Sequence, residues 1–349
     1  MKESAMKKLF FLILIICSFT PRAYGENEVK LFRGELEGAK ILIAEPAPWN
    51  KKLLILAHEY REPDTALTAD FDTNSRFYKT LLNEGWMIGS TSYRKNGIAY
   101  KEGLEDVGLL RKYIIKTYGA PDKIFIRGAS MGGAIAITLC EKHSAEYAGA
   151  LIIDPAIREE LGFSLKPMIP ILFLSNQKEA DAVKGYAADL KMDAVKPAHW
   201  VVKRDGHLNV NAEEELAAFK ALVEYAGGKD IAMEQSLLII PKDKPSLAVF
   251  ADGGAYTKIT RVHPKYGNLD TEFTPGDAAG IGLEKGKPFT VIFAEKKYKV
   301  LLGTSFGDVS KGEWIAFFQQ DGLLKIARNF ESAAALLGCK DGDILLITK

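Results

Sequence analysis

The sequence predicts a protein of two parts, a mostly parallel sheet with helices on both faces followed by a small all-β barrel. Over residues 26–230, short apolar runs alternate with segments of helical apolar spacing, which is expected when helices connect parallel strands. After Gly227-Gly228 this alternation stops. Short β-rich segments separated by glycine turns follow over residues 231–349, which favours a barrel domain.

The composition is that of an ordinary globular protein with balanced charge. The chain has 349 residues, of which 47% are hydrophobic and 26% charged, and this length favours two domains. Lysine and arginine number 46 against 45 aspartate and glutamate residues, and the formal net charge is +1. Because no basic stripe is available to contact phosphates, nucleic acid is not an expected partner.

Residues 1–25 are predicted to be a signal peptide. Lysines precede an apolar run over residues 9–19, and Ala23 and Gly25 are small residues at the two positions that a signal peptidase reads. The apolar run is shorter than the roughly 20 residues of a membrane span. We therefore expect export to the periplasm or the medium, with no stable membrane span after signal removal. A retained N-terminal anchor is the alternative.

The first part is expected to open with extended segments over residues 29–43 and to continue as alternating strands and helices. Its last helix carries a capping box, in which Asn211 is the N-cap and Glu214 follows three residues later. In such parallel sheets, function gathers at the carboxyl ends of the strands. The expected strands lie at 52–57, 86–94, 123–127, 149–154, 170–175 and 199–203, and the expected helices at 74–84, 103–118, 131–143, 180–190 and 211–225.

The motif Gly-x-Ser-x-Gly-Gly around Ser130 predicts the nucleophile of a hydrolytic site. A β-branched and aromatic run passes through Gly128 and Ser130 into an alanine-rich, helix-compatible segment, which is the strand-turn-helix setting of a nucleophile elbow. The turn must be sharp, so that the hydroxyl stands clear of the sheet. Glycine at 128 and 132 lets strand and helix approach without a Cβ clash.

A serine hydroxyl needs a general base within hydrogen-bond reach. Four histidines follow Ser130. His143 ends the helix after the elbow, His199 opens a strand at its wrong end, and His263 belongs to the second part. His207 sits in a loop between a strand and a capped helix, from which a base can reach back over the sheet. We therefore predict His207 as the general base.

The acid that orients the base is expected in the loop after the preceding strand. Glu179 and Asp181 both lie in this loop, over residues 175–181, and Glu179 is the preferred candidate. Asp154, directly after another strand, is a third candidate, because the acid of such sites occasionally comes from that strand. The order of nucleophile, acid and histidine along the chain is that of hydrolases built on this elbow.

The oxyanion of acyl transfer needs preorganised donors, commonly two backbone N–H groups. Met131 follows the nucleophile at a helix N-terminus and is expected to supply the first. The second is expected from the loop at His58-Glu59-Tyr60, most plausibly from Tyr60. Glu59 stands where glycine is common in this class of site, which leaves the conformation of the loop open.

Together these motifs resemble the α/β-hydrolase superfamily over roughly residues 29–226. The resemblance rests on the elbow from Gly128 to Gly133, on the loop Ala57-His58-Glu59-Tyr60 and on Gly206-His207. It implies two-step acyl transfer to water through a covalent acyl-serine, with no cofactor and no metal. The expected function is that of an exported carboxylic-ester hydrolase acting on a small-molecule or bulky ester. A serine peptidase of the same fold is the alternative.

The second part resembles the C-terminal barrel of the S-adenosylmethionine hydroxide adenosyltransferase family, to which the fluorinating enzymes belong, over roughly residues 257–347. The resemblance rests on Gly267-Asn268 and on the segments 307–313, 322–329, 332–334 and 337–343. It implies that Asn268, Ser332 and Ala333 contact a nucleoside and that the chain forms a homo-oligomer through the barrel.

This sequence departs from that family's pattern at two positions, Pro264 and Glu272, where the family has an acidic residue and asparagine. The family's N-terminal domain is also missing here. These departures favour a structural or docking role for the barrel over nucleoside binding. Because Glu59 and the choice of acid leave the catalytic site open, a binding protein whose barrel holds an adenosine-like ligand is the third functional hypothesis. Barrel strands are expected at 237–240, 247–250, 289–294, 298–302, 314–318 and 344–347, with one helical turn at 333–337.

Overall fold

The computed structural model describes residues 28–239 and 246–349, except 252, 265 and 320. The predicted signal peptide at residues 1–25 lies outside the described residues. Within the described ranges, no helix has the length and apolar character needed to cross a membrane.

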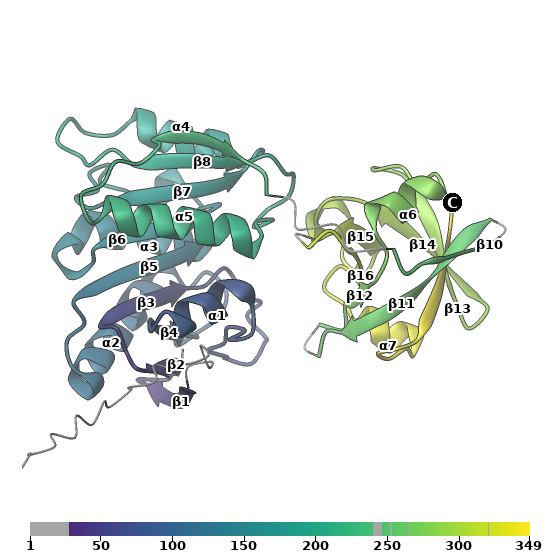
Figure 1. Cartoon of the computed structure of the whole chain (residues 1–349), viewed down its shortest axis with the longest axis horizontal. Helices are drawn as coiled ribbons and strands as arrows, with labels where there is room; N and C mark the ends of the chain where they lie inside the picture. Colours follow the sequence, from purple (N-terminus) through teal and green to yellow (C-terminus); the bar gives the residue numbers. More distant parts are fainter. Residues whose placement is uncertain (1–27, 240–245, 252, 265, 320) are drawn as a thin grey trace, which may run out of the picture.

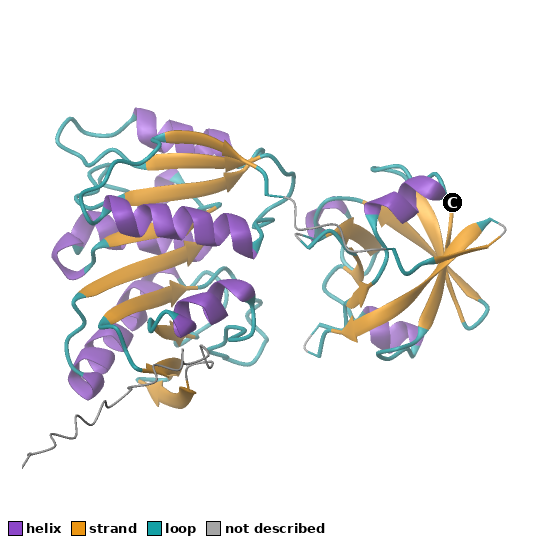
Figure 2. Ribbon diagram, viewed as in Figure 1, coloured by secondary structure: helices purple, strands orange, loops and turns teal. Residues whose placement is uncertain are grey.

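The first part of the chain forms one nine-stranded sheet, in the order β1-β2-β4-β3-β5-β6-β7-β8-β9. From β4 through β9 all neighbouring strands are parallel, and Figure 2 shows the larger strands side by side with their arrowheads on one side. At the other edge, β1 and β2 join in antiparallel pairs. The strands are β1 (Glu28–Leu36), β2 (Ala39–Ala47), β3 (Lys52–Ala57), β4 (Met87–Thr91), β5 (Lys123–Ala129), β6 (Gly149–Ile153), β7 (Ile171–Asn176), β8 (Ala198–Val202) and β9 (Glu234–Leu237).

Helices cover both faces of this sheet, as the alternation of segments predicted. Successive strand residues point to opposite faces, so Leu53 and Ile55 pack into one core cluster and Leu54 and Leu56 into another. The first cluster includes residues of α2, α3 and α4, and the second includes residues of α1 and α5. The helices are α1 (Arg76–Asn83), α2 (Tyr100–Tyr118), α3 (Met131–Lys142), α4 (Ala180–Ala188) and α5 (Ala212–Tyr225).

One expected barrel strand belongs to the first sheet instead. The sequence predicted a strand at 237–240 in the second part, but the structure has β9 at Glu234–Leu237, parallel to β8. The Trp200 indole N–H of β8 also donates to the Ala232 carbonyl at 2.7 Å. The polar sequence Glu-Gln-Ser-Leu gives no apolar strand signal, because β9 is an edge strand with little buried surface.

The second part is a small β-barrel with its own apolar core. Its eight-stranded sheet runs β10-β11-β12-β16-β15-β14-β13-β17, and an additional pairing of β11 with β17 closes it. The strands are β10 (Val249–Ala251), β11 (Gly254–Val262), β12 (Leu269–Thr271), β13 (Pro288–Phe293), β14 (Lys296–Leu302), β15 (Trp314–Phe318), β16 (Leu324–Arg328) and β17 (Ile344–Thr348), accompanied by α6 (Pro275–Gly280) and α7 (Ala333–Leu337).

The barrel lies on the side of the first sheet toward which the parallel strands point. In Figure 1 the arrowheads of β5, β7 and β8 face the barrel. The carboxyl ends of these strands, where the predicted catalytic residues lie, are therefore on the barrel side of the first sheet.

Candidate active site

Ser130 occupies a sharp turn between β5 and α3. Its backbone has φ 51° and ψ −115°, a conformation that is strained for any residue other than glycine. Residue 132 must be glycine, because a Cβ there would lie 2.0 Å from the Ala57 carbonyl oxygen. The same holds for residue 128, where a Cβ would lie 2.4 Å from the Gly132 carbonyl oxygen. The two glycines therefore permit the close approach of β5, α3 and β3 that the sequence predicted at this motif.

His207 joins the serine to a carboxylate. The His207 Nε2 atom lies 3.0 Å from Ser130 Oγ, and His207 Nδ1 lies 3.2 Å from Glu179 Oε1. With the ring proton on Nδ1, the imidazole donates to Glu179 and accepts from the serine hydroxyl, which is the arrangement of a general base. The structure thus brings together Ser130, His207 and Glu179, three residues that are far apart in the sequence.

Asp181, the other candidate acid from the same loop, is not part of this arrangement. It lies in the first turn of α4, where its carboxylate pairs with Lys184 at 3.0 Å and its side chain is 91% exposed. Glu179 immediately precedes the helix and is the residue that faces the imidazole. The start of α4 thus separates two acids that are only two residues apart.

Asp154, the third candidate acid, holds the backbone of both catalytic loops. Its carboxylate is fully buried and accepts from the Asn176 N–H at 2.7 Å and from the Leu208 N–H at 2.6 Å. Burial raises the pKa of Asp154 to about 6, and the two N–H donors oppose that rise. Asp154 therefore acts on His207 through the adjacent residue Leu208, while Glu179 contacts the imidazole directly.

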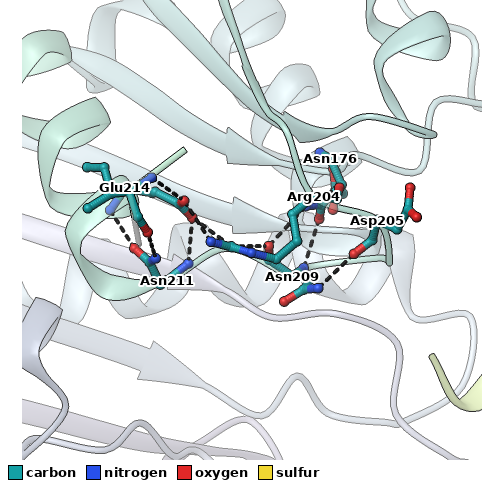
Figure 3. Close-up of polar contacts among 8 residues, drawn as sticks. Asn176, Arg204, Asp205, Asn209, Asn211 and Glu214 are labelled. Atoms are coloured by element: carbon teal, nitrogen blue, oxygen red, sulfur yellow. Dashed lines mark hydrogen bonds and ion pairs between the residues drawn. The ribbon is translucent and has the colours of Figure 1, made fainter. Parts of the chain in front are cut away.

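Asn176 makes a second link between the same two loops, a role that was not predicted from the sequence. Its side-chain amide donates to the carbonyls of Arg204 and Asn209, at 3.2 and 2.9 Å, and its side-chain oxygen accepts from the Asn209 N–H at 2.8 Å (Figure 3). The Asn209 amide in turn donates to the Asp205 carbonyl at 2.7 Å. The position of Asn176 at the carboxyl end of a predicted strand is the one sequence signal for this role.

An ion pair anchors the far end of the His207 loop to α5. Both terminal nitrogens of Arg204 donate to the Glu214 carboxylate at 2.9 Å, and Glu214 is fully buried. The predicted capping box is present, since Asn211 and Glu214 exchange side-chain to backbone bonds at the start of the helix (Figure 3). The capping glutamate thus also fixes the loop that carries the base.

The expected oxyanion donors lie on segments that meet at the elbow. Met131 is the first residue of α3, and its N–H is among those that have no partner within a helix. The loop after β3 packs against this helix start, since a Cβ on Gly132 would also approach the His58 carbonyl oxygen. Tyr93 holds this loop by donating to that oxygen at 3.1 Å, and its ring stacks on the His58 imidazole. Tyr60 follows on the same loop with a 42% exposed side chain.

The three barrel residues expected to contact a nucleoside lie near one another. Gly267, with φ +65°, packs so closely on Ser332 that a Cβ would lie 1.9 Å from its hydroxyl oxygen, and the Ala334 N–H donates to the Gly267 carbonyl. Asn268 is buried beside Gly267. The Ser332 hydroxyl accepts from the Ala335 N–H at 3.0 Å and so caps α7, which gives Ser332 a structural role that was not predicted from the sequence.

Two family models match separate parts of the chain. Residues 91–225 match the model described as serine aminopeptidase, S33, which belongs to the hydrolases. Residues 258–346 match the model of the SAM hydroxide adenosyltransferase C-terminal domain. The chain therefore combines an α/β-hydrolase domain with a β-barrel that resembles the C-terminal domain of the SAM hydroxide adenosyltransferases, as the sequence predicted.

Similar solved structures cover parts of the chain. An esterase from Pyrococcus furiosus is 16% identical over 60% of this chain and 96% of its own, with a TM-score of 0.44. An acylaminoacyl peptidase from Pyrococcus horikoshii is 13% identical over 58% of this chain and 41% of its own, with a TM-score of 0.45. An uncharacterized conserved protein from Thermotoga maritima is 20% identical over 42% of this chain, with a TM-score of 0.29, and the match spans 54% of that protein. The curated proteins gave no match.

Proposed function

We propose that this protein is a serine hydrolase that cleaves carboxylic esters. The observation that carries the proposal is His207, whose two ring nitrogens lie within hydrogen-bond distance of Ser130 Oγ and Glu179 Oε1. A serine needs such a base to become a nucleophile, and the base needs a carboxylate to hold its tautomer and to offset its charge. The match of residues 91–225 to a hydrolase family supports the same reaction class.

The proposed reaction has two acyl-transfer steps. Ser130 Oγ attacks the ester carbonyl carbon while His207 Nε2 takes the hydroxyl proton, and the N–H groups of Met131 and Tyr60 stabilise the oxyanion. The intermediate collapses to an acyl-serine, and the alcohol leaves with the proton from His207. Water then attacks the acyl-serine with His207 again as base, which releases the acid and restores the serine.

An ester is the simplest substrate for this arrangement. An alkoxide is a better leaving group than an amide anion, so ester cleavage depends less on proton donation by the general acid than peptide cleavage does. The segment between β6 and β7 is short and contains only one 3-10 turn, at Glu159–Leu161, so it supplies no large cap domain over the site. A bulky ester is therefore an acceptable substrate, and the predicted signal peptide would place the reaction in the periplasm or the medium.

Replacement of the nucleophile tests the proposal. We expect Ser130→Ala to lower kcat for short-chain p-nitrophenyl esters by at least about 10⁴-fold, because loss of a triad nucleophile leaves only binding and oxyanion stabilisation. Circular dichroism should show an unchanged fold. Equal hydrolysis by wild type and the alanine variant would refute the assignment of Ser130.

A serine peptidase is the second candidate, and the match of residues 91–225 to the serine aminopeptidase family favours it. Comparison of ester and aminoacyl or peptide substrates that share one acyl group, at equal concentration, separates the two activities. If the peptide substrate is cleaved faster than the ester, and Ser130→Ala abolishes this cleavage, peptidase activity replaces the ester proposal.

The third candidate is a binding protein whose barrel holds an adenosine-like ligand. The family match of the barrel and the close packing of Gly267, the residue before Asn268, on Ser332 favour this function. A thermal shift with adenosine or S-adenosylmethionine, lost in Asn268→Ala, would support it. Light scattering on the same protein would test the proposed homo-oligomer.

A further inference from the structure

The barrel contacts the loop that carries the proposed general base. Lys285, in the turn before β13, places its Nζ atom 2.5 Å from Asp205 Oδ2. Asp205 lies two residues before His207, in a loop that is closed by bonds from Asn209 to the Asp205 carbonyl and from Arg204 to the Asn209 carbonyl. A side chain of the barrel therefore reaches the backbone segment that positions the imidazole.

A second contact falls on the residue between Asp205 and His207. A Cβ placed on Gly206 would lie 3.5 Å from the carbonyl oxygen of Thr304, so the barrel is at van der Waals distance from this backbone. Thr304 starts a turn that Asp308 holds, because its carboxylate accepts from the Thr304 N–H and hydroxyl, at 2.5 and 2.9 Å. The surface that faces the His207 loop is thus fixed within the barrel.

The charges at this contact are complementary. The hydrogen bond from Lys285 lowers the pKa of Asp205, and the charges of Lys285 and Lys178 lower it further. Lys178 precedes Glu179, and its positive charge also acts on Asp308 of the barrel turn. Both catalytic loops therefore carry a charge that attracts a group of opposite sign on the barrel.

We propose that the barrel completes the active site, with Lys285 as a positioning residue that holds the Asp205–His207 segment and makes hydrolysis depend on barrel docking. This inference rests on the proposed function, because it assigns the barrel a part in the same reaction. The loop is anchored from within the first part by Asp154, Asn176 and the Arg204 ion pair, and Lys285 holds it from the barrel side at Asp205, the residue after Arg204.

The docking contact is weak enough to be controlled by solution conditions. The Lys285 and Asp205 side chains are 59% and 33% exposed, and exposed pairs of this kind change an equilibrium by no more than about fivefold. Salt screens such pairs, since the Debye length falls from about 10 Å at 0.1 M to about 3 Å at 1 M. The hydrolytic rate should therefore depend on ionic strength through this contact.

Three variants test the proposal. Lys285→Ala should lower kcat for a short-chain ester about two- to fivefold at low ionic strength with little change in KM, whereas Lys285→Arg should retain the wild-type rate. Lys287→Ala is the matched control, because Lys287 lies in the same turn and pairs with Glu284 on the surface. At 1 M NaCl the wild-type rate should fall to that of Lys285→Ala. At each salt concentration, wild type and Lys285→Ala should have the same melting temperature.

Equal kcat for Lys285→Ala and Lys287→Ala at low salt would overturn the positioning role. A salt dependence that is the same in wild type and Lys285→Ala would also overturn it. If the wild type hydrolyses no ester, the proposed function fails, and small-angle scattering then tests docking separately. In that measurement Lys285→Ala should show a larger radius of gyration than Lys287→Ala, and equal radii would refute docking by this pair.

Discussion

At the scale of single residues, Asp154 stabilises the catalytic loops but destabilises the folded state near neutral pH. Its buried carboxylate accepts from two backbone N–H groups of different loops, and the ionised form accepts both most strongly. Burial raises the pKa of Asp154 from 3.8 to about 6. The folded protein therefore binds a proton more tightly than the unfolded chain, and stability falls as the pH rises from about 4 to 7.

The substitution Asp154→Asn should reveal this linkage. The asparagine side chain is neutral and does not titrate, so wild type should lose roughly 2 to 3 kcal/mol of unfolding free energy relative to Asp154→Asn between pH 4 and pH 8. Urea denaturation of both proteins over this pH range measures the difference. Stability curves that run parallel over this pH range would show that folding does not change the pKa of Asp154.

Local sequence patterns indicate some residues of the site but not others. Ser130 and His207 could be predicted, because a turn motif and a loop between a strand and a capped helix are local patterns. Glu179 and Asp181 could not be separated, since the outcome depends on where α4 begins. Asn176 was not predicted because its partners lie about 30 residues away in the sequence. The Arg204–Glu214 pair was not predicted because Glu214 already had an assigned role in the capping box.

At the scale of elements, the start of α5 connects three parts of the fold. Glu214 accepts from Arg204, from the Asn211 N–H and from the Ile239 N–H that follows β9. A capping residue in most helices satisfies only its own helix end. Here the same carboxylate also fixes the loop of the base and the end of the edge strand β9, so its loss should affect all three.

Glu214→Gln should therefore cost about 3 kcal/mol or more of unfolding free energy, because it leaves the Arg204 guanidinium without its charged partner. The control on the same helix is Glu213→Gln, whose partner Arg76 is mostly exposed. Loss of that surface pair should change the unfolding free energy by less than about 1 kcal/mol. Chemical denaturation of the two variants measures both values, and similar losses would contradict the role given to Glu214.

The succession of strands and helices along the first part was largely predictable, and the exceptions have physical reasons. Strands with four or more buried apolar residues, such as β3, are evident in the sequence. The edge strand β9 has no buried residue and was expected elsewhere. Edge strands gain their stability from backbone pairing, which leaves no hydropathy signal.

At the scale of the whole molecule, the two parts could be predicted separately but their relation could not. Each part has its own core and its own family match. The contact between Lys285 and Asp205 joins residues 80 positions apart by exposed charges, and no local pattern marks such a pair. The fusion of the two parts acquires a physical explanation if the barrel supports the loop of the base.

The rate at which Ser130 reacts with a fluorophosphonate, followed by mass spectrometry, tests the central claim most directly. We predict one covalent adduct at Ser130 in wild type and none there in Ser130→Ala. Labelling should be at least about 100-fold slower in Glu179→Gln, because the acid holds the tautomer of His207, and unchanged in Asp181→Asn, whose carboxylate pairs with Lys184. Absence of an adduct in wild type, or equal labelling of Glu179→Gln and Asp181→Asn, would contradict a triad of Ser130, His207 and Glu179.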